Sequence, residues 1–552
     1  MRIVLVNWAR IWDGATGGGG VNGYCQALAL RLAKRGHDIV SLCGGTACTT
    51  SKRGGCRIRR HADWMGLRVF EVYDSPVLAP SAAQFRDPLG EVAAPELDAE
   101  IERFFRMIEP DIVHFHNIEG FSAQCVKAAR IAGARVLYSL HNYHTICPQV
   151  YLMQHHRTPC RSFDNGHACA TCIEAVDPAQ ERRTRAACGF EGPKAYVPIT
   201  LNPVRTHQTL GPTIRALGSE LVSLVHRRTG TASSDPSGGS WNAITPDSVS
   251  GPMPMVGPDE RGKAKYLLDE LDPRRWPSPL DPQWQPLDNE PTPEPDSDKP
   301  PNDYARRREA MIAMLNGCDR VLAVSEFVRR KFENLGVDPK VISTLHIGTW
   351  VNEVVSRHRE LVFDPPAFAD DPSRPVRLVF MGFNHWYKGL AMLADTLELL
   401  TPAYLRRIDL HISSLGGETI EWRFRRMEPR LARLTFHLGY EYHDIPWICG
   451  GKDLGLVPSV WWDNGPQTVF EFNACNVPVL GARLGGIPDF VEDGVNGFLF
   501  RGNDRFDMAE TLVRLLRDPT VLDRVRGRVR PPKGIDTHAA ELERVYSDCI
   551  SS

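Results

Sequence analysis

The sequence predicts an α/β protein of two Rossmann-like domains, each a doubly wound parallel sheet, that face each other across a cleft. Three observations support this prediction. The chain has 552 residues, too many for one ordinary core. Its apolar fraction of 42% is sufficient for packed cores. Short β-branched runs alternate with helical patterns, and this alternation stops near residue 345 and starts again at residue 376.

The first half contains five candidate strands with the continuous apolar character of buried parallel strands. Residues 21–37 lie between the first two candidate strands. They carry apolar side chains at helical spacing, and Gly36 would end this helix. The five candidate strands are residues 2–7, 38–43, 111–116, 135–140 and 320–325.

The second half repeats the pattern. Its candidate strands are residues 376–382, 407–413, 434–439, 453–459, 477–483 and 497–500. The tail has helical periodicity and would form a terminal helix. We therefore expect an N-terminal domain of residues 1–345, a linker of residues 346–375, a C-terminal domain of residues 376–535 and a C-terminal helix of residues 536–552.

A Pro-rich insert of about residues 205–303 interrupts the N-terminal domain. Only residues 263–271 have a helical pattern there. A long stretch of this kind is either disordered or covers a functional site. Its tryptophans, Trp241, Trp276 and Trp284, favour docking of parts of the insert on the protein.

The composition excludes several classes of protein. A formal net charge of -2 gives no basis for nucleic-acid binding by bulk charge. No stretch approaches the roughly 18 apolar residues of a membrane span. Residues 1–10 resemble a first strand rather than a signal peptide, so we expect a cytoplasmic protein. Peripheral membrane association is left open, and the oligomeric state is not predicted.

The N-terminal half has two candidate ligand-binding features at the ends of its strands. Ligands of open α/β sheets bind beyond the carboxyl ends of the strands. Gly18 and Gly19 belong to a glycine run before a helix, which favours a bound anion or forms a merely flexible turn. His116 and His141 each follow a strand, where a histidine contacts substrate or has a structural role.

The C-terminal half has a second group of candidate residues. Lys388 and Gly389 come at the start of a helix, an arrangement suited to phosphate. Gly485 and Gly486 open a tight loop before another helix. In WWDNGPQTVFEFNAC, Asp463 and Glu471 are either two ligand-binding carboxylates or a helix-capping Asp and an incidental surface Glu.

The stretch DNGPQTVFEFNACNVPVLGARLGGIPDFVEDGVNGFLF resembles the nucleotide-sugar signature of the retaining GT-B glycosyltransferases of family four. The glycine-rich loop, the strand-end histidines and residues 324–327 also fit that family. The resemblance implies that Asp463 lies near the donor sugar, Glu471 binds the ribose, and Lys388 contacts the diphosphate. It places His141, Asp463 and Lys388 at the reacting centre and His116 and Asn142 on the acceptor side. The implied donor-binding residues are Glu471, Lys388, Gly18, Gly19, Gly382, Gly389, Asn464, Gly465, Gly485 and Gly486.

The family implies transfer of a sugar from a nucleotide-diphosphate donor, with retention and without a catalytic metal. It also implies that residues 1–345 form the acceptor-side domain and residues 376–535 the nucleotide-sugar-binding domain. The acceptor would be a glycan, a lipid-linked sugar or a small molecule. Two positions depart from the family pattern: Asp463 replaces a Glu, and Phe383 replaces an Arg whose charge His385, loop N–H groups or Arg483 would have to supply. A nucleotide-sugar epimerase and a non-catalytic sugar-binding protein are the alternatives.

Four cysteines form a separate pattern near the first site. Cys147, Cys160, Cys169 and Cys172 have the spacing C-x12-C-x8-C-x2-C. Four thiolates would satisfy tetrahedral zinc, and the alternative is a set of plain buried thiols. Such a zinc ion would be structural and would order the loop beside His141.

Overall fold

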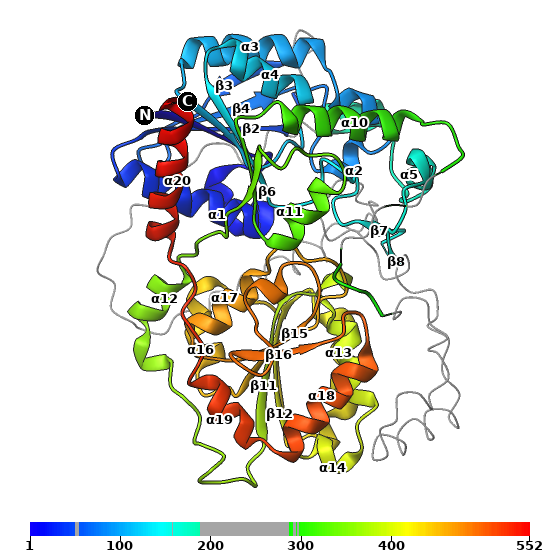
Figure 1. Ribbon diagram of the computed structural model, residues 1–552, viewed down its shortest axis with the longest axis vertical. Helices are drawn as coiled ribbons and strands as arrows, with labels where there is room; N and C mark the ends of the chain where they lie inside the picture. The colour runs from blue at the N-terminus through cyan, green and yellow to red at the C-terminus, as the bar shows by residue number, and fades with distance from the viewer. Residues whose placement is uncertain (50–54, 157, 188–285, 291–293, 295–296, 552) are drawn as a thin grey trace, which may run out of the picture. The chain divides into compact units, whose positions relative to one another are not determined.

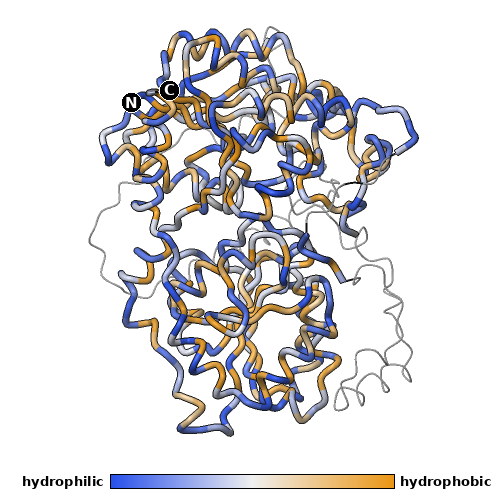
Figure 2. The backbone as a smooth tube through the Cα atoms, viewed as in Figure 1, coloured by the Kyte–Doolittle hydropathy of each residue, from blue (hydrophilic) through white to orange (hydrophobic). Residues whose placement is uncertain are grey.

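Two sheets organise the part of the chain that the computed structural model describes, which is residues 1–49, 55–156, 158–187, 286–290, 294 and 297–551 (Figure 1). The predicted α/β class with two Rossmann-like sheets is confirmed. Hydrophobic residues gather along the strands of both sheets (Figure 2). No helix among these residues is long and apolar enough to cross a bilayer.

The first sheet has eight strands in the order β10-β9-β6-β5-β1-β2-β4-β3. All neighbours pair in parallel except the edge strand β3, which is antiparallel to β4. The five predicted strands are confirmed, and β3, β4 and β10 were not predicted. In chain order the strands are β1 (Arg2–Val6), β2 (Asp38–Ala47), β3 (Arg57–Arg60), β4 (Arg68–Tyr73), β5 (Ile112–Phe115), β6 (Arg135–Leu140), β9 (Arg320–Ala323) and β10 (Ile342–Thr344).

Helices connect these strands and cover both faces of the sheet. Successive side chains of a strand point to opposite faces of the sheet. In β1 the neighbouring residues Ile3 and Val4, as well as Val6, are fully buried, so both faces of the sheet are covered. The helices of this half are α1 (Gly14–Lys34), α2 (Ser81–Gln84), α3 (Pro95–Ile108), α4 (Ala123–Ile131), α5 (His167–Ala170), α6 (Pro178–Ala187), α10 (Asp303–Asn316) and α11 (Glu326–Glu333).

The second sheet has six parallel strands in the order β13-β12-β11-β14-β15-β16. All six predicted strands are confirmed. The chain order reverses between β11 and β14, which makes this the switch point where ligands of such sheets bind. The strands are β11 (Val376–Phe383), β12 (Ile408–Leu415), β13 (Arg433–His437), β14 (Leu454–Val457), β15 (Val479–Ala482) and β16 (Gly497–Phe500).

The last helix of the chain lies beside the first one (Figure 1). Helix α20 (Ile535–Ser551) packs on α1, and its His538 is bonded to Tyr24 of that helix. The end of the chain therefore contributes side chains to the first half. The other helices of the second half are α12 (Val351–Arg357), α13 (Leu390–Glu398), α14 (Pro402–Leu405), α15 (Glu418–Met427), α16 (Ile445–Cys449), α17 (Gln467–Ala474), α18 (Arg505–Arg517) and α19 (Thr520–Arg526).

Most of the Pro-rich insert lies outside the described residues, including Trp241, Trp276, Trp284 and the helical pattern at 263–271. Residues 286–290, 294 and 297–303 of the insert are described, and residues 286–290 form a segment that we name the strap. The strap contacts the second half of the chain: the Leu287 N–H donates to the Gly502 carbonyl (2.9 Å), and the Asp288 carbonyl accepts from the Trp462 indole (3.2 Å). Leu287 is buried.

The strap generates a prediction about stability. Leu287→Ala should lower the free energy of unfolding by about 2–3 kcal/mol, because it removes a buried leucine from a packed site. The neighbouring Asp288 binds Trp462 through its backbone and exposes its side chain, so Asp288→Ala is the matched control and should change stability by less than about 0.5 kcal/mol. Urea unfolding measures both. Equal effects of the two changes would show that the strap is not anchored by Leu287.

Candidate functional site

Two loops meet at the switch point of the second sheet. The loop after β11 carries Lys388 at the end of the short helix η7 (Trp386–Lys388), and the loop after β14 carries Asp463. The Lys388 Nζ lies 2.9 Å from Asp463 Oδ2. Burial opposes the charge of Lys388, but Asp463, with help from Tyr387 and Glu471, outweighs it and raises the pKa of Lys388. The ammonium therefore stays charged at the mouth of the site.

Two glycines allow these loops to approach each other. Gly389 has φ +79°, and a Cβ there would overlap the carbonyl oxygen of Pro458. Gly485 has φ +55°, and a Cβ there would overlap the backbone of Asp463. The N–H of Gly486 donates to the Asp463 carbonyl (2.7 Å), so the backbone of this loop is fixed as well. The predicted donor-side glycines are thus required for the packing of the loops.

Asp463 does not cap a helix. The residue that precedes α17 is Pro466, and it makes no side-chain cap. The Asp463 carboxylate is buried and accepts from Lys388, from the Ser459 hydroxyl (3.4 Å) and from the Gly465 N–H (3.4 Å). The capping alternative is therefore wrong.

Glu471 is a buried residue rather than an incidental surface glutamate. It lies on α17 with 5% of its surface exposed, and Tyr440 donates to its Oε2 (3.4 Å). Burial raises the pKa of Glu471 to about 7, against the opposing effects of Tyr440 and Lys388. An ionised carboxylate here lacks the hydrogen bonds that its charge requires, which is the state that a ligand with hydroxyl donors would relieve.

Asn464 and Gly382 complete the predicted donor-side group of the second half. Asn464 is buried between Asp463 and Gly465, and neither polar atom of its side chain has a partner among the described residues. Buried amides are normally satisfied, so Asn464 is available to a polar ligand. Gly382 lies near the end of β11 with φ +150°, where the strand leads into the Lys388 loop.

The glycine-rich loop of the first half interrupts helix α1. Gly18 and Gly19 have non-helical backbone angles, so regular helix resumes beyond them. The carbonyl of Gly20 accepts a hydrogen bond from the Gln467 side chain of α17 (2.9 Å). The loop therefore touches the helix that carries Glu471.

The two predicted histidines form a pair at the carboxyl ends of β5 and β6. His116 Nδ1 and His141 Nε2 are 3.1 Å apart. His141 is partly accessible, whereas His116 is 1% exposed and lies behind it. The ring of His116 contacts His141, and its assignment to the acceptor side stays a prediction. Asn142 uses its carbonyl oxygen to accept from the His144 N–H (3.0 Å), so this oxygen holds a turn.

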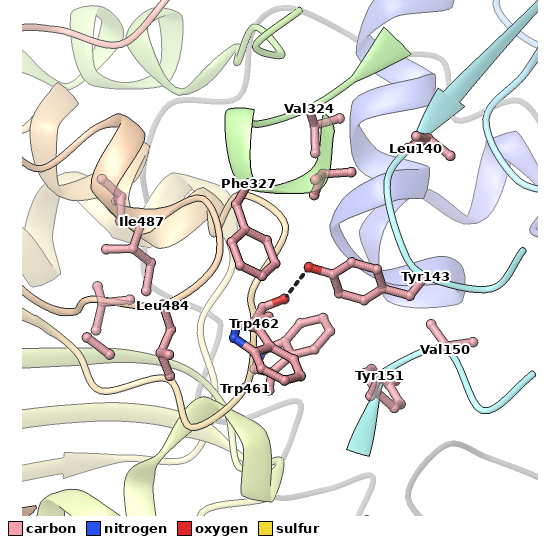
Figure 3. Packing of buried hydrophobic residues seen from close by; sticks show 14 of the residues in the cluster. Leu140, Tyr143, Val150, Tyr151, Val324, Phe327, Trp461, Trp462, Leu484 and Ile487 are labelled. Atoms are coloured by element: carbon pink, nitrogen blue, oxygen red, sulfur yellow. Dashed lines mark hydrogen bonds between the residues drawn. The ribbon is translucent and has the colours of Figure 1, made fainter. Parts of the chain in front are cut away.

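Aromatic packing and a hydrogen bond link the loop after β6 to the loop after β14 (Figure 3). The Tyr143 hydroxyl, just after His141, donates to the Trp462 carbonyl (2.8 Å). Phe327 of α11 stacks on Trp462 at 6.1 Å between ring centres. Asp489 accepts from the Glu326 N–H (2.7 Å) and caps the start of α11. No sequence pattern predicts these supporting contacts, although residues 324–327 fit the family.

Of the two side chains expected to replace the missing arginine at Phe383, His385 is neutral and Arg483 is engaged in an ion pair. Phe383 itself is 48% exposed at the end of β11. The His385 ring packs on Tyr387 at 3.9 Å, and burial lowers the pKa of His385 to about 3, so the ring is neutral. Arg483 pairs with Asp493 (3.2 Å). Lys388 and the loop N–H groups therefore remain as the positive elements of the predicted diphosphate site.

The four cysteines line one small cavity, as their grouping in the sequence predicted. Cys147, Cys160, Cys169 and Cys172 all contribute to its wall. However, no three His, Cys, Asp or Glu side chains in the described part of the chain are placed to hold one metal ion. Burial raises the pKa of Cys160 to about 12 and that of Cys172 to about 11, which keeps both protonated. The structural zinc site and the set of plain thiols both stay predictions.

The chain matches two family models. Residues 375–518 match "Glycosyl transferases group 1", and residues 19–197 match "Glycosyl transferase 4-like domain". Together the matches cover more than half of the chain.

Curated relatives match over part of the chain. The D-inositol 3-phosphate glycosyltransferase of Thermobifida fusca is 44% identical over 252 residues, which are 41% of this chain and 52% of the relative. The protein of that name from Mycolicibacterium smegmatis is 44% identical over 93 residues, or 17% of this chain and 21% of the relative. The chain thus spans about half, or less, of the length of these relatives.

Solved structures show the same fold. Sucrose-phosphate synthase from Thermosynechococcus elongatus has a TM-score of 0.52 at 13% identity, covering 100% of this chain and 99% of the other. A UDP-forming α,α-trehalose-phosphate synthase from Burkholderia xenovorans, in complex with glucose-6-phosphate, has a TM-score of 0.51 at 11% identity, covering 99% and 100%.

Glu471 generates a prediction about stability and pH. Between pH 4.5 and 7 the folded chain holds the proton of Glu471 and the unfolded chain has lost it, so this group lowers the free energy of unfolding as the pH rises. Glu471→Gln should therefore be more stable than the wild type at pH 8, by up to about 3 kcal/mol. The difference should vanish near pH 4. The control is Glu418→Gln at an exposed position, with a change below about 0.5 kcal/mol. Parallel unfolding curves for wild type and Glu471→Gln across this range would contradict the raised pKa.

Proposed function

Because the chain belongs to the glycosyl transferases group 1 and has the GT-B fold, we propose that it is a retaining glycosyltransferase. It would move a sugar from a nucleotide-diphosphate donor to an acceptor. The observation that carries the proposal is the meeting of Lys388, Asp463 and Glu471 at the switch point of the second sheet. One cation and two buried carboxylates there match the charges and hydroxyl groups of such a donor.

In the proposed complex, Lys388 stabilises the diphosphate leaving group. The N–H groups at the start of α13, after Gly389, and those at Gly485 and Gly486 add donors to the same anion. Fixed donors of this kind act where negative charge develops, which is on the phosphate oxygen that departs from the anomeric carbon. The Asp463 contact holds the Lys388 ammonium in place before the donor binds.

The two carboxylates would recognise the two sugars of the donor. Glu471 would accept from neighbouring ribose hydroxyls, and ribose binding would favour its ionised form. Asp463 would accept from hydroxyls of the transferred sugar, with Asn464 beside it. The family usually has the longer Glu where Asp463 lies, so the sugar would sit slightly closer to this backbone.

The reaction needs no carboxylate nucleophile. The bond between the anomeric carbon and the phosphate oxygen breaks, and the bond to the acceptor oxygen forms on the same face. The acceptor proton passes to the departing phosphate oxygen, and the nucleoside diphosphate leaves. Burial lowers the pKa of His141 to about 3, so its ring is neutral beside the reacting sugar.

The acceptor would bind loops of the first half and is a glycan, a lipid-linked sugar or a small molecule. The cysteines of the described chain are free thiols, which supports the proposed cytoplasmic location. A panel of UDP-, GDP- and ADP-glucose tested by thermal shift would identify the base, since a bound donor raises the melting temperature.

Nucleotide release separates the proposal from its alternatives. A transferase should release nucleoside diphosphate faster when the acceptor is present. An epimerase that hydrolyses its donor would release it without acceptor, and a sugar-binding protein would release none.

The site residues generate a prediction about catalysis. Lys388→Ala should lower kcat by about 10²–10³-fold, because it removes the cation at the leaving group. Glu471→Ala should weaken nucleotide binding by roughly ten- to a hundredfold. Asp463→Ala removes the sugar contact and also frees Lys388, so it should weaken free-nucleotide binding less than Glu471→Ala does and should impair transfer. Arg483→Ala, which removes a cation paired elsewhere, is the control and should stay within about twofold. Calorimetry and initial rates measure these effects. Near-native rates for Lys388→Ala would remove it from the site.

A further inference from the structure

We propose that His116 is a positioning residue that fixes the tautomer of His141, so that His141 presents an N–H donor and not a basic nitrogen to the substrate. Helix α20 supports both rings through His538 and Tyr546. The inference deepens the proposed function and rests on it for the identity of the substrate. The tautomer itself can be tested without any substrate.

The histidine pair has one ring inside and one ring at the surface. His116 follows β5, and its backbone N–H donates to the Val6 carbonyl (2.9 Å), which continues the sheet. Its Nδ1 faces His141 Nε2 at 3.1 Å. The other nitrogen of His116, Nε2, is buried and has no partner among the described residues. His141 is partly accessible.

The unpartnered Nε2 decides the proton positions. Burial, with neighbouring histidines, lowers the pKa of His116 well below its usual range, and burial lowers that of His141 to about 3. Each neutral ring has one N–H. A buried N–H without a partner is rarer in proteins than a buried acceptor without one. The proton of His116 is therefore on Nδ1 and is donated to His141 Nε2.

This assignment determines what His141 offers to a ligand. Because its Nε2 accepts from His116, its own proton is on Nδ1. That nitrogen has no partner among the described residues. An Nδ1–H suits an oxygen of the donor sugar or of the diphosphate. A nitrogen that already carries a proton cannot accept the acceptor proton. This agrees with transfer of that proton to the leaving phosphate.

Rings from α1 and α20 surround the pair. The His538 Nε2 lies 2.7 Å from the Tyr24 hydroxyl, and the Tyr24 ring is 4.9 Å from that of His141. Behind His116, the ring of His114 lies at 4.1 Å between centres. The pair is therefore packed against side chains from both ends of the chain.

Tyr546 fixes His114 in turn. Its hydroxyl is 2.7 Å from His114 Nδ1, and Ser139 Oγ is 2.8 Å from Nε2, so both nitrogens of His114 are satisfied. The charged state of His116 would face His114, His141 and His538 with no carboxylate bonded to it. Residues that are far apart in sequence thus keep the ring of His116 neutral.

Nitrogen NMR of the full chain, labelled with ¹⁵N-histidine at pH 7, tests the tautomer directly. The shift of a protonated ring nitrogen differs from that of a bare one, and the His141 signals are assigned by their loss in His141→Asn. We expect protonated Nδ1 and bare Nε2 for His141. His116→Phe keeps the ring shape and removes the donor, so the His141 signals should move toward the Nε2–H form. His443→Phe, at an exposed position, should leave them unchanged.

Kinetics supply the second readout. An asparagine side chain offers an amide N–H in place of Nδ1–H, so His141→Asn should keep turnover within about tenfold, while His141→Asp should lose roughly a hundredfold or more. His116→Phe should lower kcat by roughly ten- to a hundredfold with little change in KM. The readout is release of nucleoside diphosphate, with acceptor present, from whichever of UDP-, GDP- and ADP-glucose the thermal-shift panel selects. A wild-type His141 that is protonated on Nε2, or charged, overturns the inference. Absence of nucleotide release with the expected tautomer would instead count against the proposed function.

Discussion

One ion pair, between the Lys388 ammonium and the Asp463 carboxylate, joins the loops that leave β11 and β14. The two loops approach closely enough for it only because Gly389 and Gly485 lack side chains where Pro458 and Asp463 pass. The pair holds a cation at the switch point while leaving the carbonyl of Asp463 bonded to Gly486. Removing either charge would leave the other largely buried without a partner, so the loops and their charges form one unit.

The site has supports from both halves of the chain, and apart from the Asp489 carboxylate they are backbone and aromatic groups. Tyr143 reaches the Trp462 carbonyl from the loop after β6, and Asp489 caps α11. The strap adds a hydrogen bond to the Trp462 indole. Charged groups would compete with a phosphate or a hydroxyl for Lys388 and Glu471. Neutral supports fix the loops without occupying the groups that a ligand needs.

Sequence patterns predicted the strands well where both faces are buried. The runs of β1 and β11 are continuously apolar, which is a strong local signal. β3 was not predicted, because RIRR is an edge strand with charged side chains, and β10 is only three residues long. The candidate residues Lys388, Asp463 and Glu471 were found by motif, but their burial was not. The burial of His116 and the neutral state of His385 could not be predicted, because burial and ring packing depend on contacts between distant segments, which spacing does not contain.

Several polar groups at the site are less satisfied than the fold alone would require. Glu471 is buried with one hydrogen bond, the Asn464 side chain has none among the described residues, and His116 Nε2 is bare. A core selected only for stability would replace such groups by apolar ones. His116 follows β5, and Asn464 and Glu471 belong to the loop and the helix that follow β14. The uncompensated groups are of one chemical kind, oxygens and nitrogens that accept from or donate to hydroxyls. A sugar nucleotide supplies many such partners at once, so its binding would recover much of what folding leaves unsatisfied.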